Sequence, residues 1–229
     1  MTPASIASQD WRPLPPRSPS DGAAEGDLGD LRFRALLSDC DWHALPPATR
    51  RRFSHRLAGG DSIVYAGRVV ETRMSRLGWC LAQALRVIGG PLPLARDHDV
   101  PAVVAVTEDM VAGGQGWTRV YARRSAFPQV IHSAKRFAGR TGLEEHVGHG
   151  IGMALTVHVV GAALVFRSAG YFVRLLGRTV ALPAWLSPGA LTVTHMALTD
   201  GWFAFTLDLH HPRFGALIRQ TAVFQEAGK

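Results

Sequence analysis

The sequence predicts an α+β, mainly β protein: one large curved or barrel-like antiparallel sheet of about ten strands, with two or three short helices near the N-terminal half. From Val100 almost to the C terminus, short runs rich in branched and aromatic residues are separated by Gly or Pro, which is typical of strands. The connections are too short for crossover helices, so neighbouring strands should pair antiparallel. A sheet of this many strands rarely stays flat, so it should curve or close.

The N-terminal part is expected to hold a tail and two short helices. Residues 1–29 are rich in proline, serine and glycine and lack apolar periodicity, which predicts a disordered tail. Asp30 can cap a helix over residues 31–37, which the small and acidic residues 38–41 should end. A second helix should begin with Pro47 in its first turn and continue through residue 53.

One strand and one helix are expected before Val100. Residues 61–73 alternate without helical spacing, which favours a strand. Apolar residues then recur at three- and four-residue intervals over residues 77–88, which predicts an amphipathic helix that Gly89 ends. Cys80 in this helix is interpreted as a small core residue rather than a nucleophile.

Ten further runs are expected to form strands, with 182–188 as a loop or single turn. The runs cover residues 100–110, 116–124, 127–137, 141–147, 154–160, 162–168, 171–176, 191–199, 202–210 and 215–224. The charge-free stretch 147–166 approaches membrane-spanning length, but its histidines, glycines and branched residues favour strands, so no transmembrane segment is expected. Residues 30–224 should therefore form a single globular domain, followed by a C-terminal tail over residues 225–229.

Composition narrows the partners and the compartment. The formal net charge is +7, but 23 of the 25 basic residues are arginines, and they are scattered rather than gathered around an aromatic stacking platform. Nucleic acid is therefore not an expected partner. The two cysteines, Cys40 and Cys80, are too few for a disulfide framework, which favours a cytoplasmic protein.

Seven short motifs occur in a characteristic order between Phe33 and Phe224. They are LPPATRRRF (45–53), SIVYAGRVV (62–70), VP (100–101), WTR (117–119), EHVG (145–148), ALPAWLSP (181–188) and DGWFAFTLDLHHPRFGALI (200–218). In this order they resemble the bacterial domain of unknown function 4166 family. The chain departs from the family pattern at Gln115, at Arg123 and in the stretch RQTAVF near the C terminus.

The resemblance implies no established activity. In longer relatives this domain looks like an appendage to nicotinamide-dependent reductase or epimerase domains, so the resemblance implies a stand-alone auxiliary domain with a reductase or epimerase protein as a possible partner. The chain itself has no GxGxxG motif after a strand, so no bound cofactor is expected.

Three residues in the motifs are candidate binding residues. Trp117 and Arg119 share one face of their expected strand, and a guanidinium beside an indole can bind a carboxylate or phosphate. Glu145, in the EHVG motif, is the third. The stretch 144–149 contains two Glu and two His, but alternation leaves two of these side chains on each face, which is too few ligands for a metal site.

Three functions stay open. The preferred one is a non-catalytic module whose curved sheet encloses an apolar pocket for a hydrophobic or lipid-like small molecule, with Arg119 meeting its polar end. The alternative is a hydrolase- or isomerase-type enzyme in the same pocket, with His195 as general base beside Asp208. A role as interaction partner of a nicotinamide-dependent reductase is the third possibility.

The pairing of His195 with Asp208 depends on one hairpin. Asp200-Gly201 readily adopts a two-residue type I′ turn, which would set Phe203 opposite Leu198 and Phe205 opposite Met196. In that register the two phenylalanines lie in the core, and His195 and Asp208 share the opposite face. A slip of one residue would send each set to the other face.

Overall fold

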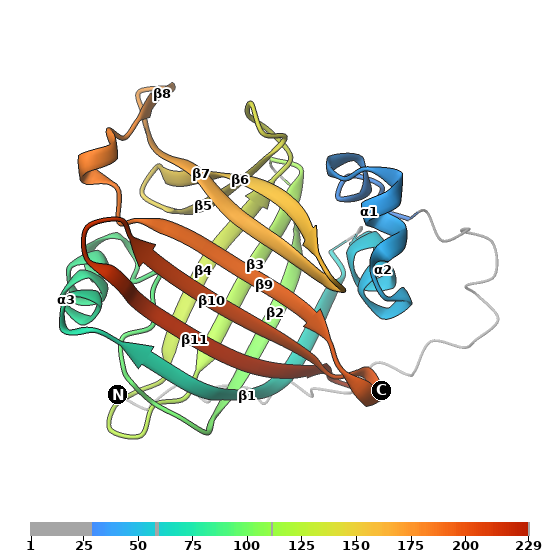
Figure 1. The fold of residues 1–229 in the computed structure, drawn as a ribbon, viewed down its shortest axis with the longest axis horizontal. Coiled ribbons are helices and arrows are strands. Elements are labelled where there is room, and N and C mark those ends of the chain that lie inside the picture. The colour runs from blue at the N-terminus through green and yellow to red at the C-terminus, as the bar shows by residue number, and fades with distance from the viewer. Residues whose placement is uncertain (1–28, 58–59, 111, 229) are drawn as a thin grey trace, which may run out of the picture.

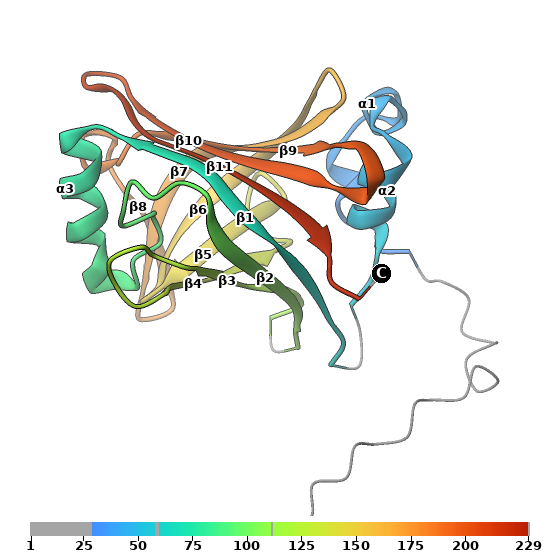
Figure 2. The same ribbon diagram turned by 90° about the horizontal axis from the view of Figure 1, so that it is seen from below.

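The chain folds into a closed antiparallel β-barrel, as the computed structural model shows over residues 29–57, 60–110 and 112–228. Within these residues eleven strands form one sheet, and ten of them close into a ring (Figures 1 and 2). The prediction of a curved or barrel-like sheet is confirmed. The expected tail over residues 1–29 lies, except for Gly29, outside the described residues.

The strands are close to the runs expected from the sequence. They are β1 (Ser62–Met74), β2 (Val100–Asp109), β3 (Gly114–Tyr121), β4 (Gln129–Arg136), β5 (Leu143–Gly148), β6 (Ile151–Val160), β7 (Ala163–Leu175), β8 (Arg178–Ala181), β9 (Ala190–Ala197), β10 (Phe203–His211) and β11 (Gly215–Glu226). The last strand thus includes the first two residues of the segment that was expected to be a C-terminal tail.

The helices are short. They are the α-helices α1 (Asp39–Ala44), α2 (Pro47–Ser54) and α3 (Arg76–Ala84) and the 3-10 helices η1 (Arg34–Leu36), η2 (Leu85–Ile88), η3 (Ala184–Leu186) and η4 (Thr199–Gly201). The helix expected over residues 31–37 is only the single turn η1. Residues 38–41, expected to end it, instead begin α1, because the Ser38 side chain accepts a hydrogen bond from the Asp41 backbone N–H and caps the new helix.

Strands β1 to β7 pair in chain order, and β9, β10 and β11 complete the ring back to β1. The two runs expected over residues 162–176 form one continuous strand, β7, with an irregularity in its pairing to β6 near Gly170. Strand β9 pairs only with residues 163–167 of β7, whereas residues 172–175 of β7 pair with the extra strand β8. The wall of the barrel therefore divides at this point.

The register predicted for the β9–β10 hairpin is wrong by one residue. The loop holds three residues, 199–201, with Asp200 and Gly201 both at positive φ, and Leu198 pairs with Trp202. Phe203 and Phe205 therefore lie opposite Ala197 and His195. Both phenylalanines still face inward, Phe203 fully buried and Phe205 half-buried.

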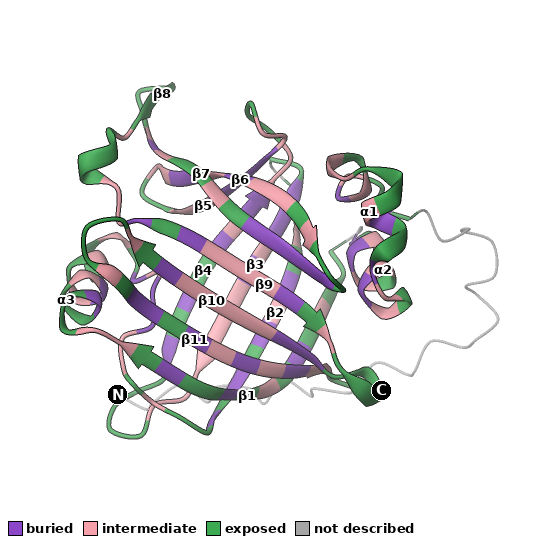
Figure 3. Ribbon diagram, in the orientation of Figure 1, coloured by how far each residue is buried: buried purple, intermediate pink, exposed green. Residues whose placement is uncertain are grey.

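Helices α1 and α2 cover one end of the barrel, and α3 lies at the other end (Figures 1 and 2). At the first end, Phe53 of α2 packs edge-on against Phe33, with ring centroids 5.2 Å apart, and also contacts Phe166 of β7. Buried residues alternate with more exposed ones along strands such as β2, so each strand contributes one face to the interior (Figure 3).

At the other end, Gly78 of α3 lies so close to the Leu217 backbone that a Cβ atom would collide with it, so this helix packs directly on β11. Cys80 on the outer side of α3 is exposed, which corrects the prediction that it is a core residue. None of the described helices is both long enough and apolar enough to cross a membrane.

Candidate functional site

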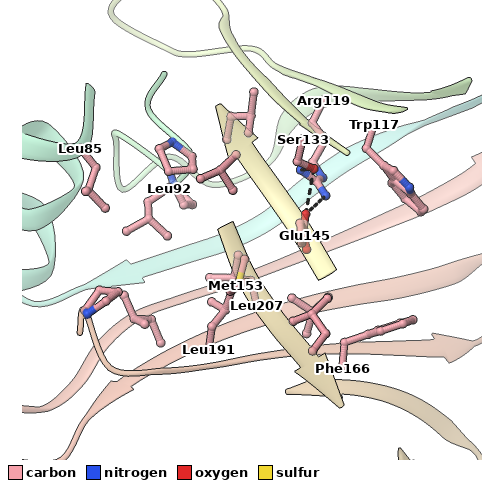
Figure 4. A pocket seen from close by; sticks show the side chains of 18 of the residues that line it. Leu85, Leu92, Trp117, Arg119, Ser133, Glu145, Met153, Phe166, Leu191 and Leu207 are labelled. Atoms are coloured by element: carbon pink, nitrogen blue, oxygen red, sulfur yellow. Dashed lines mark hydrogen bonds and ion pairs between the residues drawn. The ribbon is translucent and has the colours of Figure 1, made fainter. Parts of the chain in front are cut away.

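The barrel encloses a cavity of about 330 Å³. Most side chains on its wall are apolar; among them are Leu85, Leu92, Val104, Ile131, Met153, Leu155, Phe166, Leu191, Leu207 and Phe224 (Figure 4). At the α3 end the cavity is bounded by η2, by Pro91–Pro93 and by the segment that contains η3; at the opposite end Phe53 of α2 contributes to the wall.

A polar cluster interrupts this apolar wall. It consists of Arg119 of β3, Ser133 and Lys135 of β4, and Glu145 of β5, which the strand register brings side by side. Glu145 Oε1 accepts hydrogen bonds from Ser133 Oγ at 2.8 Å and from an Arg119 guanidinium nitrogen at 3.2 Å. Glu145 Oε2 forms an ion pair with Lys135 Nζ at 3.1 Å. Two cationic side chains therefore share one carboxylate.

The charges in the cluster depend on one another. Burial alone would raise the pKa of Glu145, but the charges of Lys135 and Arg119 and the hydrogen bond from Ser133 outweigh burial and hold it at about 2. Burial lowers the pKa of Lys135, and the Glu145 carboxylate opposes that shift and favours the charged ammonium. The cluster therefore combines two basic side chains with one ionised carboxylate.

Trp117 forms an aromatic wall beside this cluster. Lys135 Nζ lies 4.8 Å from the centre of its ring, and the Arg119 guanidinium carbon lies 5.6 Å from it. The indole Nε1 is buried without a hydrogen-bond partner among the described residues. The structure thus places all three candidate binding residues, Trp117, Arg119 and Glu145, on the wall of one cavity.

The catalytic pair considered from the sequence, His195 with Asp208, is not formed. His195 is fully buried, and its Nε2 lies 3.0 Å from an Arg52 guanidinium nitrogen. Asp208 lies opposite Thr192 and makes an ion pair with Arg219, both partly exposed. The one-residue difference in register puts the two side chains on opposite faces of the sheet.

His195 contributes to the covered end of the barrel rather than to the cavity wall. Its ring stacks on Phe203 and meets Phe53 edge-on, each with centroids 5.1 Å apart. Burial and, secondly, the nearby charge of Arg52 lower the pKa of His195 to about 3. The imidazole is therefore neutral at pH 7, and Nε2 accepts a hydrogen bond from the guanidinium.

Strand alternation separates the side chains of the EHVG region as expected. Glu144 and His146 lie together on the face opposite Glu145, with His146 Nε2 3.1 Å from Glu144 Oε2, and Arg174 binds the same carboxylate oxygen at 2.9 Å. Among the described residues, no group of three or more His, Cys, Asp or Glu side chains could hold a metal ion.

The sequence interpretation missed Ser133 and Lys135. Lys135 is one of two lysines among 25 basic residues, and residues 129, 131, 133 and 135 are all buried along β4. A lysine at an inward position of an alternating strand was the available signal, because lysine is rarely fully buried unless it is paired.

The family model described as Domain of unknown function (DUF4166) matches residues 45–224 of this chain. The match covers most of the sequence, so the chain belongs to this family, and the resemblance of the motifs is confirmed. No curated protein matches the chain. No solved structure matches it either.

Proposed function

We propose that this member of the domain of unknown function 4166 family binds an apolar small molecule with an anionic group inside its barrel. The apolar part fills the cavity, and the anionic group, a carboxylate or a phosphate, binds beside Arg119. The observation that carries the proposal is that Arg119 and Lys135 share a single carboxylate, Glu145, on an otherwise apolar wall.

The size and the lining of the cavity support a small ligand. Sites for small molecules typically measure about 300–1,000 Å³ and combine an apolar lining with a few polar groups that fix orientation. The cavity of about 330 Å³ lies at the lower end of this range. Its polar groups lie mainly on one side of the wall, on β3 to β5, which suits an amphiphile better than a uniformly polar molecule.

The excess of basic side chains over carboxylates supports an anionic group. A ligand carboxylate or phosphate would accept the strong, charge-assisted hydrogen bonds that a guanidinium donates. Arg119 is the most accessible member of the cluster, since its side chain is 21% exposed against 8% for Lys135 and for Glu145. The guanidinium has five N–H donors and can bind an anion while it keeps its bonds to Ser133 and Glu145.

We place this binding in the cytoplasm. Cys40 and Cys80 are both exposed and free, and exposed unpaired thiols suit a reducing compartment.

The direct test measures binding of 1-anilinonaphthalene-8-sulfonate, an apolar anion, to the full chain. Arg119→Met keeps the ion pair of Lys135 with Glu145 and removes the guanidinium together with its hydrogen bonds to Ser133 and Glu145, so affinity should fall at least about tenfold. Arg167→Met is the matched control, because Arg167 is exposed on β7 and does not line the cavity. Equal affinities for the wild type and the Arg119 variant would refute the proposal.

Untargeted mass spectrometry of the purified protein gives a second readout. We expect a retained apolar carboxylic acid or phosphate in the wild type and less of it in the Arg119→Met variant. A retained cationic ligand would contradict the assigned charge complementarity.

A further inference from the structure

The α3 end of the barrel carries an exposed apolar surface, here called the rim, which consists of residues 76–88, 174–188 and 210–214. Figures 1 and 2 place these segments at the same end, opposite α1 and α2. The exposed large apolar side chains of the rim are Leu77, Trp79, Val87, Leu175, Leu176, Val180, Trp185, Leu186 and Phe214. Several project far into solvent: Trp185 is 79% exposed, and Leu176 is fully exposed.

Leu176 is locally unfavourable in the position it occupies. Leu176 and Gly177 connect β7 to β8 in a two-residue turn, and both have positive φ, 49° and 76°. A turn of this kind prefers Asn-Gly, because a branched apolar side chain is strained at positive φ. A fully exposed leucine here gains no burial within the described chain, so packing of the described residues does not account for it.

The three segments of the rim contain five arginines, Arg76, Arg86, Arg174, Arg178 and Arg213, and no Asp or Glu. Arg174 is already paired with Glu144, so the positive charge of the rim comes mainly from the other four arginines. The exposed acids Glu71 and Asp99, on and beside neighbouring strands, are each paired with an arginine. Tryptophan beside arginine and aliphatic side chains is typical of the interface between a bilayer and water.

We propose that the rim docks this protein on the surface of an anionic lipid bilayer. Leu176, Trp185 and their apolar neighbours insert among the headgroups, and the rim arginines bind the lipid phosphates. A second copy of the chain fits less well, because a twofold contact would press one basic surface against another. The proposal goes beyond ligand binding and does not depend on it, although docking would bring the α3 end of the cavity to the lipid.

The test measures partition of the full chain onto vesicles of pure phosphatidylcholine and onto an equal mixture of phosphatidylcholine and phosphatidylglycerol. We expect binding to the mixed vesicles, weakened by added salt, and little binding to the neutral ones. Each arginine near an anionic surface contributes about fivefold to partition, so Arg178→Gln with Arg213→Gln should weaken binding about 25-fold.

The apolar contribution is tested with Leu176→Asn combined with Trp185→Ser. Asn suits the turn better than Leu, so Leu176→Asn should leave the fold intact or stabilise it, while the double variant loses at least tenfold in vesicle binding. The matched controls lie at the opposite end: Val160→Ser, at the exposed last residue of β6, and Arg51→Gln, exposed on α2. Both should bind vesicles as the wild type does.

Three results would overturn the proposal. The first is that the wild type does not bind anionic vesicles, and the second is that the rim variants and the control variants lose vesicle binding equally. The third is a dimer in sedimentation that Leu176→Asn dissociates, because the rim would then be an interface between two copies of the chain. Arg119→Met should not alter vesicle binding. The test of membrane docking by the rim can therefore fail independently of the test of ligand binding in the cavity.

Discussion

His195 of β9 and Phe205 of β10 are direct cross-strand neighbours, with ring centroids 5.1 Å apart. This pairing follows from the three-residue loop at 199–201, and it turns the imidazole into the interior. A histidine in this position cannot exchange protons freely with solvent, so its main effect is on stability.

We therefore predict that the chain loses stability in mild acid. The folded-state pKa of His195, about 3, lies below the unfolded value of 6.5, so below pH 6.5 the unfolded chain binds the extra proton. The stabilisation is complete above pH 6.5 and is lost as pH falls towards 3. From about pH 7.5 to about pH 5, the loss should be about 2 kcal/mol in urea unfolding.

His195→Gln should remove most of this pH dependence, because the amide does not titrate and its oxygen can still accept from Arg52. The control is His158→Gln, an exposed position on β6. A pH dependence unchanged in the His195 variant would contradict the assignment.

Phe203 and Phe205 should differ in their contribution to stability. Phe203 is fully buried between Tyr65, His195 and Phe224, so Phe203→Ala should cost about 3–5 kcal/mol of unfolding free energy. Phe205 is half-buried on the cavity wall, and its truncation should cost less and enlarge the cavity. Denaturant unfolding compares them, and an equal or larger cost for Phe205→Ala would count against this arrangement.

Glu145→Gln should destabilise the chain by about 3–5 kcal/mol, because it leaves the Lys135 ammonium buried without its carboxylate. Adding Lys135→Met removes that buried charge and should restore most of the lost stability. A double-mutant cycle on unfolding free energies measures this coupling. Additive effects of the two changes would mean that the ion pair is not formed in solution.

Gly67→Ala should weaken the closure of the barrel between β1 and β11. A Cβ atom at Gly67 would collide with the Val223 backbone, which cannot move without disturbing the pairing of the two strands. Gly116→Ala is the control, since its added methyl would meet only the Thr107 side-chain hydroxyl, which can rotate. Thermal unfolding should show a much lower Tm for Gly67→Ala than for Gly116→Ala.

The short strand-like runs and the short connections between them were enough to predict most strands and a curved or barrel-like sheet, but not whether the sheet closes. They did not determine the register at Asp200-Gly201, because this pair fits a two-residue turn and also the end of a three-residue loop with both residues at positive φ. The choice between the two loops depends on which face of β9 packs into the core. In the structure this face includes His195, and a polar residue rarely takes such an inward position.

The candidate binding site was predictable only in part. Trp117 and Arg119 lie on one strand, so alternation alone puts them on a shared face. Ser133 and Lys135 join them only through the pairing of β4 with β3 and β5, which is a property of the tertiary fold. The sign of the charge in the cavity therefore depends on contacts that no single strand contains.

The division of the wall at β7 has a consequence for hydrogen exchange. Residues 178–181 of β8 are exposed and pair only with the last residues of β7, whereas β9 is held on both sides. Amide protons of β8 should therefore exchange with solvent well before those of β9. Local opening of the β7–β8 hairpin should therefore occur without global unfolding, while the ten-stranded ring stays protected.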